Sequence, residues 1–155
     1  MSTPPPNSFR ITGAPNITYA KWETERFETD STSWIDLPGA SVDLSPGQGA
    51  PSYGAIFLAT FSAEALSSDQ NGDGQGLMNA TVFFGSEQSE PLSNNHRYIT
   101  ARGNPEWSSH TFLRVVRFEP EFTNRSVNAQ VKLKVSSGDK GGVQNWVLKV
   151  ERYNL

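Results

Sequence analysis

The chain has 155 residues, no cysteine and a formal net charge of 13 − 16 = −3. This length suits one domain with its own core, and the lack of cysteine excludes disulfides and thiolate-ligated metal sites. The aromatic residues (Trp 4, Tyr 4, Phe 9) argue against disorder. The slightly acidic charge argues against nucleic-acid binding, which depends on many Lys and Arg side chains.

The first segment, residues 1–15, predicts an extended arm. Pro4, Pro5 and Pro6 favour polyproline II, which has no internal hydrogen bonds, and Phe9 follows them as an apolar anchor. An isolated arm of this kind is disordered unless its own domain or a neighbouring subunit holds it. These four residues are therefore a candidate partner-binding segment.

The chain shows neither the basic and apolar regions of a secretory signal nor an apolar run of membrane-spanning length. We therefore expect a soluble protein that does not insert into membranes. Its expected location is a virion or extracellular surface after release, and otherwise the cytoplasm.

Residues 16–155 predict a single domain built of strands, because apolar and polar residues alternate in them. The clearest alternation runs from Val127 to Val135, and Trp146–Val150 repeats it. Only Phe61–Ser68 could form a short helical turn. The other expected strands are Ile17–Phe27, Trp34–Leu37, Ala40–Leu44, Gly54–Ala63, Leu77–Gly85, Arg97–Ala101 and His110–Phe118.

Turn signals rich in Gly and Pro separate these strands. Eight or nine strands in one domain predict an all-β fold, a two-sheet antiparallel β-sandwich. A jelly-roll-like arrangement fits best because it needs about eight strands. An immunoglobulin-like topology is the alternative, but it takes about 100 residues and would leave a surplus.

Charge is distributed unevenly along the chain. Residues 1–96 carry 3 basic and 11 acidic groups (3 − 11 = −8), and residues 97–155 carry 10 basic and 5 acidic groups (10 − 5 = +5). In a fold whose early and late strands interleave, this places opposite charges on paired strands. Alternatively, the acidic part of one copy contacts the basic part of a neighbouring copy.

Four sequence segments, taken together, resemble those of a group of uncharacterised bacterial β-sandwich proteins. They lie within roughly residues 32–152 and are Thr32–Ala40, Phe61–Glu64, Trp107–His110 and Asn145–Arg152. The resemblance implies a β-sandwich and no activity. Members of that group often carry cysteines after the Phe-Ser-Ala-Glu segment, where this chain has an Asp/Gly-rich loop. In size and in its aromatic closing strand the chain is more loosely similar to trimeric tumour-necrosis-factor-like jelly rolls, and in architecture to phage head-decoration domains.

The loop from Asp69 to Gly76 matches the first half of a calcium loop, with side-chain oxygens on Asp69, Asn71 and Asp73. The second half does not match, because Ala80 stands where a bidentate acidic residue belongs. Glu64 could complete a weaker site. The alternative is an ordinary turn-forming loop without a cofactor.

No catalytic arrangement is evident. Ser109 and His110 are adjacent, and adjacent residues on a strand point to opposite faces, so they do not form a nucleophile–base pair. We therefore predict a protein that is not an enzyme.

Three aromatic residues are candidates for a ligand or interface surface: Trp107, Tyr98 and Tyr53. Arg114 and Arg117 lie among aliphatic residues, which predicts a structural ion pair with Glu64, itself set in an apolar segment.

Two functions remain. The first is a non-enzymatic structural protein that self-assembles, as a trimer by the resemblance, and decorates a larger assembly such as a virion capsid or an extracellular structure. The second is a carbohydrate-binding module or lectin, assisted by calcium if the Asp69 loop holds an ion.

Overall fold

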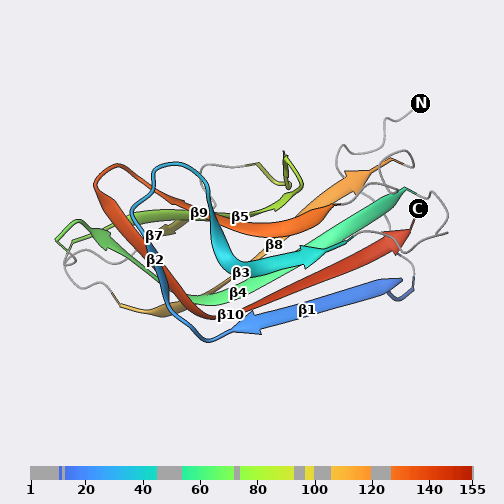
Figure 1. The fold of residues 1–155 in the computed structure, drawn as a ribbon, viewed down its shortest axis with the longest axis horizontal. Coiled ribbons are helices and arrows are strands. Elements are labelled where there is room, and N and C mark those ends of the chain that lie inside the picture. Colours follow the sequence, from blue (N-terminus) through green and yellow to red (C-terminus); the bar gives the residue numbers. More distant parts are fainter. Residues whose placement is uncertain are drawn as a thin grey trace, which may run out of the picture.

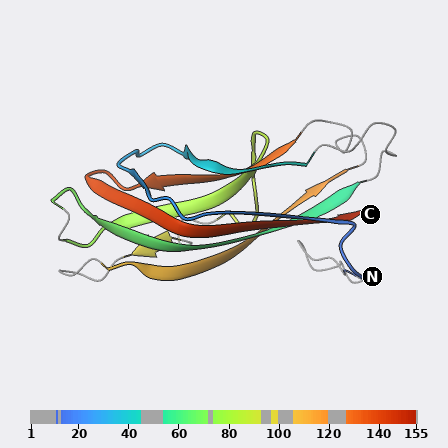
Figure 2. The ribbon, with the colours of Figure 1, turned by 60° about the horizontal axis from the view of Figure 1, so that its bottom comes forward.

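The protein is an antiparallel β-sandwich in the computed structural model, which describes residues 11, 13–44, 54–71, 74–92, 97–99, 106–119 and 127–154. Two sheets lie face to face with the core between them (Figures 1 and 2). No helix in these described ranges is long and apolar enough to span a membrane.

Sheet A has the strand order β1-β10-β4-β8, with β2 also paired to β10. Its strands are β1 (Ile17–Glu23), β2 (Phe27–Thr29), β4 (Ala55–Asp69), β8 (Ser108–Phe118) and β10 (Asp139–Asn154). Sheet B has the order β3-β9-β5-β6, with β7 also paired to β5. Its strands are β3 (Ile35–Asp43), β5 (Leu77–Phe84), β6 (Glu87–Gln88), β7 (Arg97–Ile99) and β9 (Asn128–Val135).

The pairing is nested along the chain. β1 pairs with β10, β3 with β9, β4 with β8, and β5 with β6. A chain whose strands pair from its two ends inward forms one long antiparallel ribbon. Here the ribbon is wound so that β4 pairs with β10 in one sheet and β5 pairs with β9 in the other. Two sheets formed in this way make a jelly roll. The sequence-based fold prediction is therefore confirmed.

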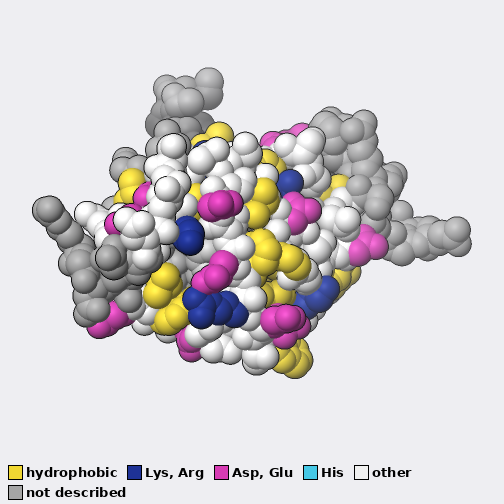
Figure 3. Space-filling view, turned by 60° about the vertical axis from the view of Figure 1, so that its left-hand side comes forward, with side chains coloured by type: hydrophobic (Ala, Val, Ile, Leu, Met, Phe, Trp, Pro, Cys, Tyr) yellow, Lys and Arg dark blue, Asp and Glu magenta, His cyan; other side chains and the backbone are white. Residues whose placement is uncertain are grey.

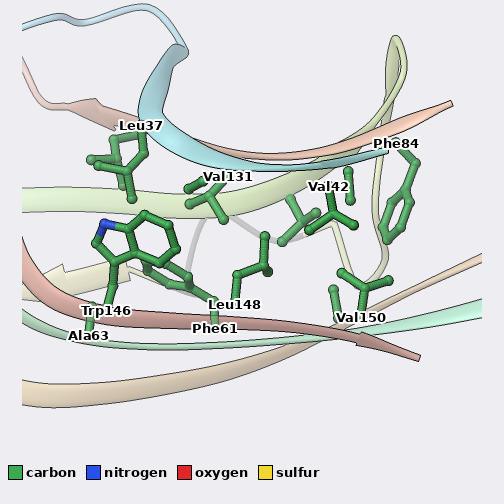
Figure 4. Close-up of a cluster of buried hydrophobic side chains, with 14 of the residues drawn as sticks. Leu37, Val42, Phe61, Ala63, Phe84, Val131, Trp146, Leu148 and Val150 are labelled. Atoms are coloured by element: carbon green, nitrogen blue, oxygen red, sulfur yellow. The ribbon is translucent and has the colours of Figure 1, made fainter. Parts of the chain in front are cut away.

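Alternating apolar residues fill the space between the sheets. Trp146, Leu148 and Val150 of β10 point from sheet A toward Leu37 and Val131 of sheet B (Figure 4). The Phe57 and Phe84 rings bring the two sheets together with their centroids 5.7 Å apart. Burial of this apolar surface is the main stabilising contribution of the fold.

Phe61–Ser68, the segment in which the sequence left a short helical turn possible, is a strand. This segment lies inside β4, where Phe61, Ala63 and Ala65 are buried in the core and the residues between them face outward. Short apolar runs do not distinguish a helix from a strand. The strands β10 and β8, which pair with β4 on its two sides, impose the extended form.

Two further boundaries differ from the sequence prediction. The expected strand Ile17–Phe27 is divided into β1 and β2. The expected strands Trp34–Leu37 and Ala40–Leu44 are instead parts of β3, with a register shift between Asp36 and Ser41. Gly39 has a φ of 79°, which lets the backbone turn at this shift while β3 still pairs with β9 on both sides of it.

A bulge changes which side of β10 faces the core. Gln144 pairs with Glu64 and Val147 with Ser62, so three steps along β10 match two along β4. Asn145, inside the bulge, has a φ of 47°, a conformation that Asn tolerates better than most residues. Because of the extra residue, both Val143 and Trp146 are buried.

The charged halves of the chain interleave. Asp36 of β3 forms an ion pair with Lys132 of β9 (3.2 Å), which joins an early acid to a late base. On the face drawn in Figure 3, acidic and basic side chains lie beside one another. The uneven distribution along the sequence is therefore mixed by the strand order.

We expect Leu148→Ala to lower the free energy of unfolding by about 3 kcal/mol, because it leaves a cavity in the core. Leu148 is 0% exposed, whereas Leu113, on the opposite side of the same sheet, is 55% exposed. Leu113→Ala is therefore the matched control, with an expected change of less than about 0.5 kcal/mol. Urea unfolding followed by Trp fluorescence measures both, and equal losses would contradict this assignment of the core.

Candidate functional site

The outer face of sheet A carries most of the candidate functional residues in the described part of the chain. One end, near the β10 bulge, is polar and contains Glu64. The middle is apolar and contains Trp22 and Val147, which lie directly opposite each other on β1 and β10.

At the polar end, the Glu64 carboxylate stabilises the bulge. Gln144 Nε2 donates to Glu64 Oε2 (2.9 Å), and Asn145 Nδ2 donates to the same oxygen (3.0 Å). These hydrogen bonds favour the ionised carboxylate and lower the pKa of Glu64 from its ordinary value of 4.5. Glu64 is therefore a structural acceptor.

The predicted ion pair between Glu64 and Arg114 or Arg117 is wrong. Glu64 lies opposite Ser109 on β8, whereas Arg114 lies opposite Ala59. Five residues of extended strand separate these positions, about 17 Å. Arg117 instead binds Glu119, with its Nε 3.1 Å from Oε1.

Arg114 points into the sandwich and is 4% exposed. Its guanidinium carbon lies 4.6 Å from the centre of the Phe112 ring, and its Nη1 donates to the Leu113 carbonyl (3.1 Å). Burial lowers the pKa of Arg114. Among the described residues, Arg114 therefore stacks on an aromatic ring and does not pair with a carboxylate. An arginine among aliphatic residues is compatible with either contact, so the sequence pattern could not distinguish them.

Trp107 is half-buried and covered on one face. The ring packs over Gly142, which has no side chain to obstruct it. A Cβ added to Gly142 would lie 3.1 Å from the Trp107 ring. The Arg26 guanidinium stacks on the ring at 4.8 Å and is also paired with Glu28. The predicted surface aromatic is therefore part of a stacked cluster.

The Asp69 loop is held by hydrogen bonds between side chains and its own backbone. Asp69 Oδ1 accepts from the Asn71 amide (2.9 Å), and Ser67 Oγ donates to the Gly76 carbonyl (2.8 Å). Glu64 is five residues from Asp69 along β4, about 17 Å, so it does not join a site in the loop. The described residues contain no group of three or more His, Cys, Asp or Glu side chains that could hold a metal. Asp73 lies outside them, and calcium binding by the loop stays a prediction.

The other predicted site residues lie outside the described structure. They are the arm residues Pro4, Pro5, Pro6 and Phe9, together with Tyr53 and the side chain of Tyr98. Their roles stay predictions.

One pair of polar residues was missed at the sequence level. Ser108 Oγ lies 3.0 Å from His110 Nε2, because residues two apart on β8 share a face. Partial burial lowers the pKa of His110, which favours the neutral imidazole. Both residues are nevertheless largely exposed to solvent. Acyl transfer requires a site that excludes water, so this contact by itself does not form such a site. The spacing i, i+2 was the signal that could have identified this contact.

The apolar middle of the face was also missed. Trp22 is 71% exposed, and Val147 opposite it is 47% exposed. Next along the same row lie Ser62 and Thr111, which are hydrogen-bonded to each other (3.0 Å). Leu113 occupies the far edge of the face, on β8. The sequence did not select Trp22 over the other tryptophans, because its outward direction follows from the pairing of β1 with β10.

No protein-family model and no curated protein matches this chain. Solved structures that resemble it include a mutant VP2 protein of infectious bursal disease virus from derived T=1 particles, with 13% identity, a TM-score of 0.47 and coverage of 99% of this chain and 36% of that one. A VP2 subviral particle of the same virus gives 13% identity, a TM-score of 0.42 and coverage of 97% and 36%. The chain spans about a third of the length of these proteins. At this identity and TM-score, the likeness carries no argument about function.

We expect the Glu64 carboxyl to titrate below 4.5, and to move back toward that value in Gln144→Ala and Asn145→Gly. Glycine keeps the positive φ of the bulge while removing the amide donor. Because the folded pKa is lowered, the contribution of Glu64 to stability is present above 4.5 and is lost as pH falls through the folded value. Carbon-13 NMR of the carboxyl group measures each pKa, and an unchanged value in both variants would refute the assigned hydrogen bonds.

Proposed function

We propose that this chain is a non-enzymatic structural protein that assembles with copies of itself and decorates a larger surface, such as a virion capsid or an extracellular structure. The observation that carries the proposal is the exposed apolar pair Trp22 and Val147 on the outer face of sheet A. Contiguous apolar side chains rimmed by polar residues are typical of protein–protein contacts.

The surroundings of this pair support the proposal. Lys149 and Glu151 are the nearest charged residues along β10, and they neutralise each other at 3.5 Å. The neighbouring positions on this face are small or uncharged, including Ala20, Ser62 and Thr111. A flat, nearly neutral surface with a central Trp offers a partner much contact area at little desolvation cost.

Carbohydrate binding is the second candidate, because the exposed Trp22 ring could stack on a sugar. Trp107, already stacked under Arg26, is less suited to this role. A glycan array with and without calcium distinguishes the two functions. Binding that disappears in Trp22→Ala would favour the lectin hypothesis.

We expect the full chain to form oligomers whose average mass rises with concentration, and the double variant Trp22→Ser/Val147→Ser to remain monomeric because the apolar contact is lost. Leu92→Ser is the matched control, since Leu92 is 58% exposed but lies outside sheet A. Sedimentation velocity from nanomolar to high micromolar concentration measures the mass. A wild-type chain that is monomeric throughout would contradict self-assembly, and the mass reached distinguishes the trimer that the resemblance implies from a dimer.

A further inference from the structure

The edges of the two sheets differ in how well they are protected against pairing with another strand. At the edge of sheet B, β3 carries Pro38 and a register shift. On the opposite side of the sandwich, Val115 of β8 exchanges backbone hydrogen bonds with Glu90 (2.7 and 2.8 Å). The edge strands β6 and β7 have only 2 and 3 residues. Proline, irregularity, coverage, shortness and charged side chains are the usual ways in which proteins prevent association at a sheet edge.

Of these protections, β1 has in the described structure the charged side chains of Lys21 and Glu23. It extends over 7 residues without proline and pairs with β10 in one continuous register. In the portion of the chain that the structure describes, β10 is the only strand paired with β1. Figure 1 shows β1 at the border of its sheet. Among the described residues, one side of the β1 backbone therefore has no strand paired with it.

The side chains of β1 suggest which strand fits. On the outer face stands Trp22, opposite Val147. On the other face stand Lys21 and Glu23, which are both exposed and have opposite charges. Lys21 Nζ donates to the Ser41 carbonyl (3.3 Å), and Glu23 Oε1 accepts from the amides of residues 24 and 25. These hydrogen bonds hold the Lys21 ammonium group and the Glu23 carboxylate close to the β1 edge of sheet A.

A second copy of β1 complements this pattern in one antiparallel register. If Trp22 lies opposite Trp22 of the second copy, each Lys21 lies opposite a Glu23, and residues 21–23 at the end of β1 are the segment that pairs. Registers centred on Lys21 or on Glu23 would place like charges opposite each other, which is destabilising. A register centred on Ala20 would place Glu23 opposite Ile17 and leave its charge without a partner.

We propose that the end of β1, residues 21–23, pairs with the same residues of a second copy in the Trp22-centred register, so that the two copies of sheet A meet at a two-fold axis perpendicular to the sheet. The two Trp22 rings then stack across the axis, flanked by the two Val147 side chains, and two Lys21–Glu23 pairs lie on the other face. An isologous contact of this kind is the commonest form of self-association. The inference rests on the proposed self-assembly and names its contact.

Charge reversal tests the register in the full-length chain. We expect Lys21→Glu and Glu23→Lys each to weaken dimer formation about tenfold or more, because each places like charges opposite each other. The double variant Lys21→Glu/Glu23→Lys restores opposite charges and should dimerise like the wild type. Lys140→Glu, an exposed reversal at the far end of β10, is the control. Sedimentation equilibrium gives the dissociation constants, and a double variant as weak as the single variants would overturn the proposed register.

Cross-linking provides a second measurement that does not depend on charge. The chain has no cysteine, so an introduced one is unique. A mixture of Lys21→Cys and Glu23→Cys chains should form a disulfide between copies, because directly opposite residues are close enough. A mixture of Lys149→Cys and Glu151→Cys chains, whose sites lie inside the sheet on β10, should not. Equal cross-linking in the two mixtures would also overturn the register. Assembly that is lost in Trp22→Ser/Val147→Ser but insensitive to the charge and cysteine variants would overturn β1 pairing while leaving the proposed function standing, and a chain that never associates would refute both.

Discussion

The structure depends on β10, which hydrogen-bonds to β1 and β2 on one side and to β4 on the other. It also supplies Trp146, Leu148 and Val150 to the core. A strand that closes the nested ribbon and fills the interior couples the two ends of the chain. Among the described strands, the first, β1, therefore has no partner until β10, the last, is in place. Pairing between strands so far apart in the chain is entropically expensive to form.

The bulge in β10 links the core to the outer face. One extra residue lets Val143 and Trp146 both face inward, and it places Gln144 and Asn145 where their amides reach Glu64. The Glu64 carboxylate is thus used to hold a backbone irregularity. A polar residue within an apolar segment here reflects the needs of the sheet, and neither a metal nor an arginine is required to explain it.

The outer face of sheet A combines two arrangements of aromatic residues. At one end Trp107 is covered by Arg26, so its surface is already satisfied within the chain. In the middle Trp22 is exposed and lies opposite Val147. Because β1 also has one backbone side without a paired strand among the described residues, an exposed apolar side chain and free hydrogen-bonding groups coincide in one strand. This coincidence is the physical basis for placing the proposed self-association there.

The sequence by itself determined the all-β sandwich, because alternation such as that of Val127–Val135 depends only on which side of a strand each residue occupies. It also indicated the Trp146–Val150 core stripe and the turn-forming Asp69 loop. Only the tertiary structure decided that Phe61–Ser68 is a strand, that Glu64 binds the bulge instead of Arg114, and that Trp22 faces outward while Trp107 is covered. Each of these depends on register between strands far apart in the chain, and register is a property of the paired sheet that no local pattern contains.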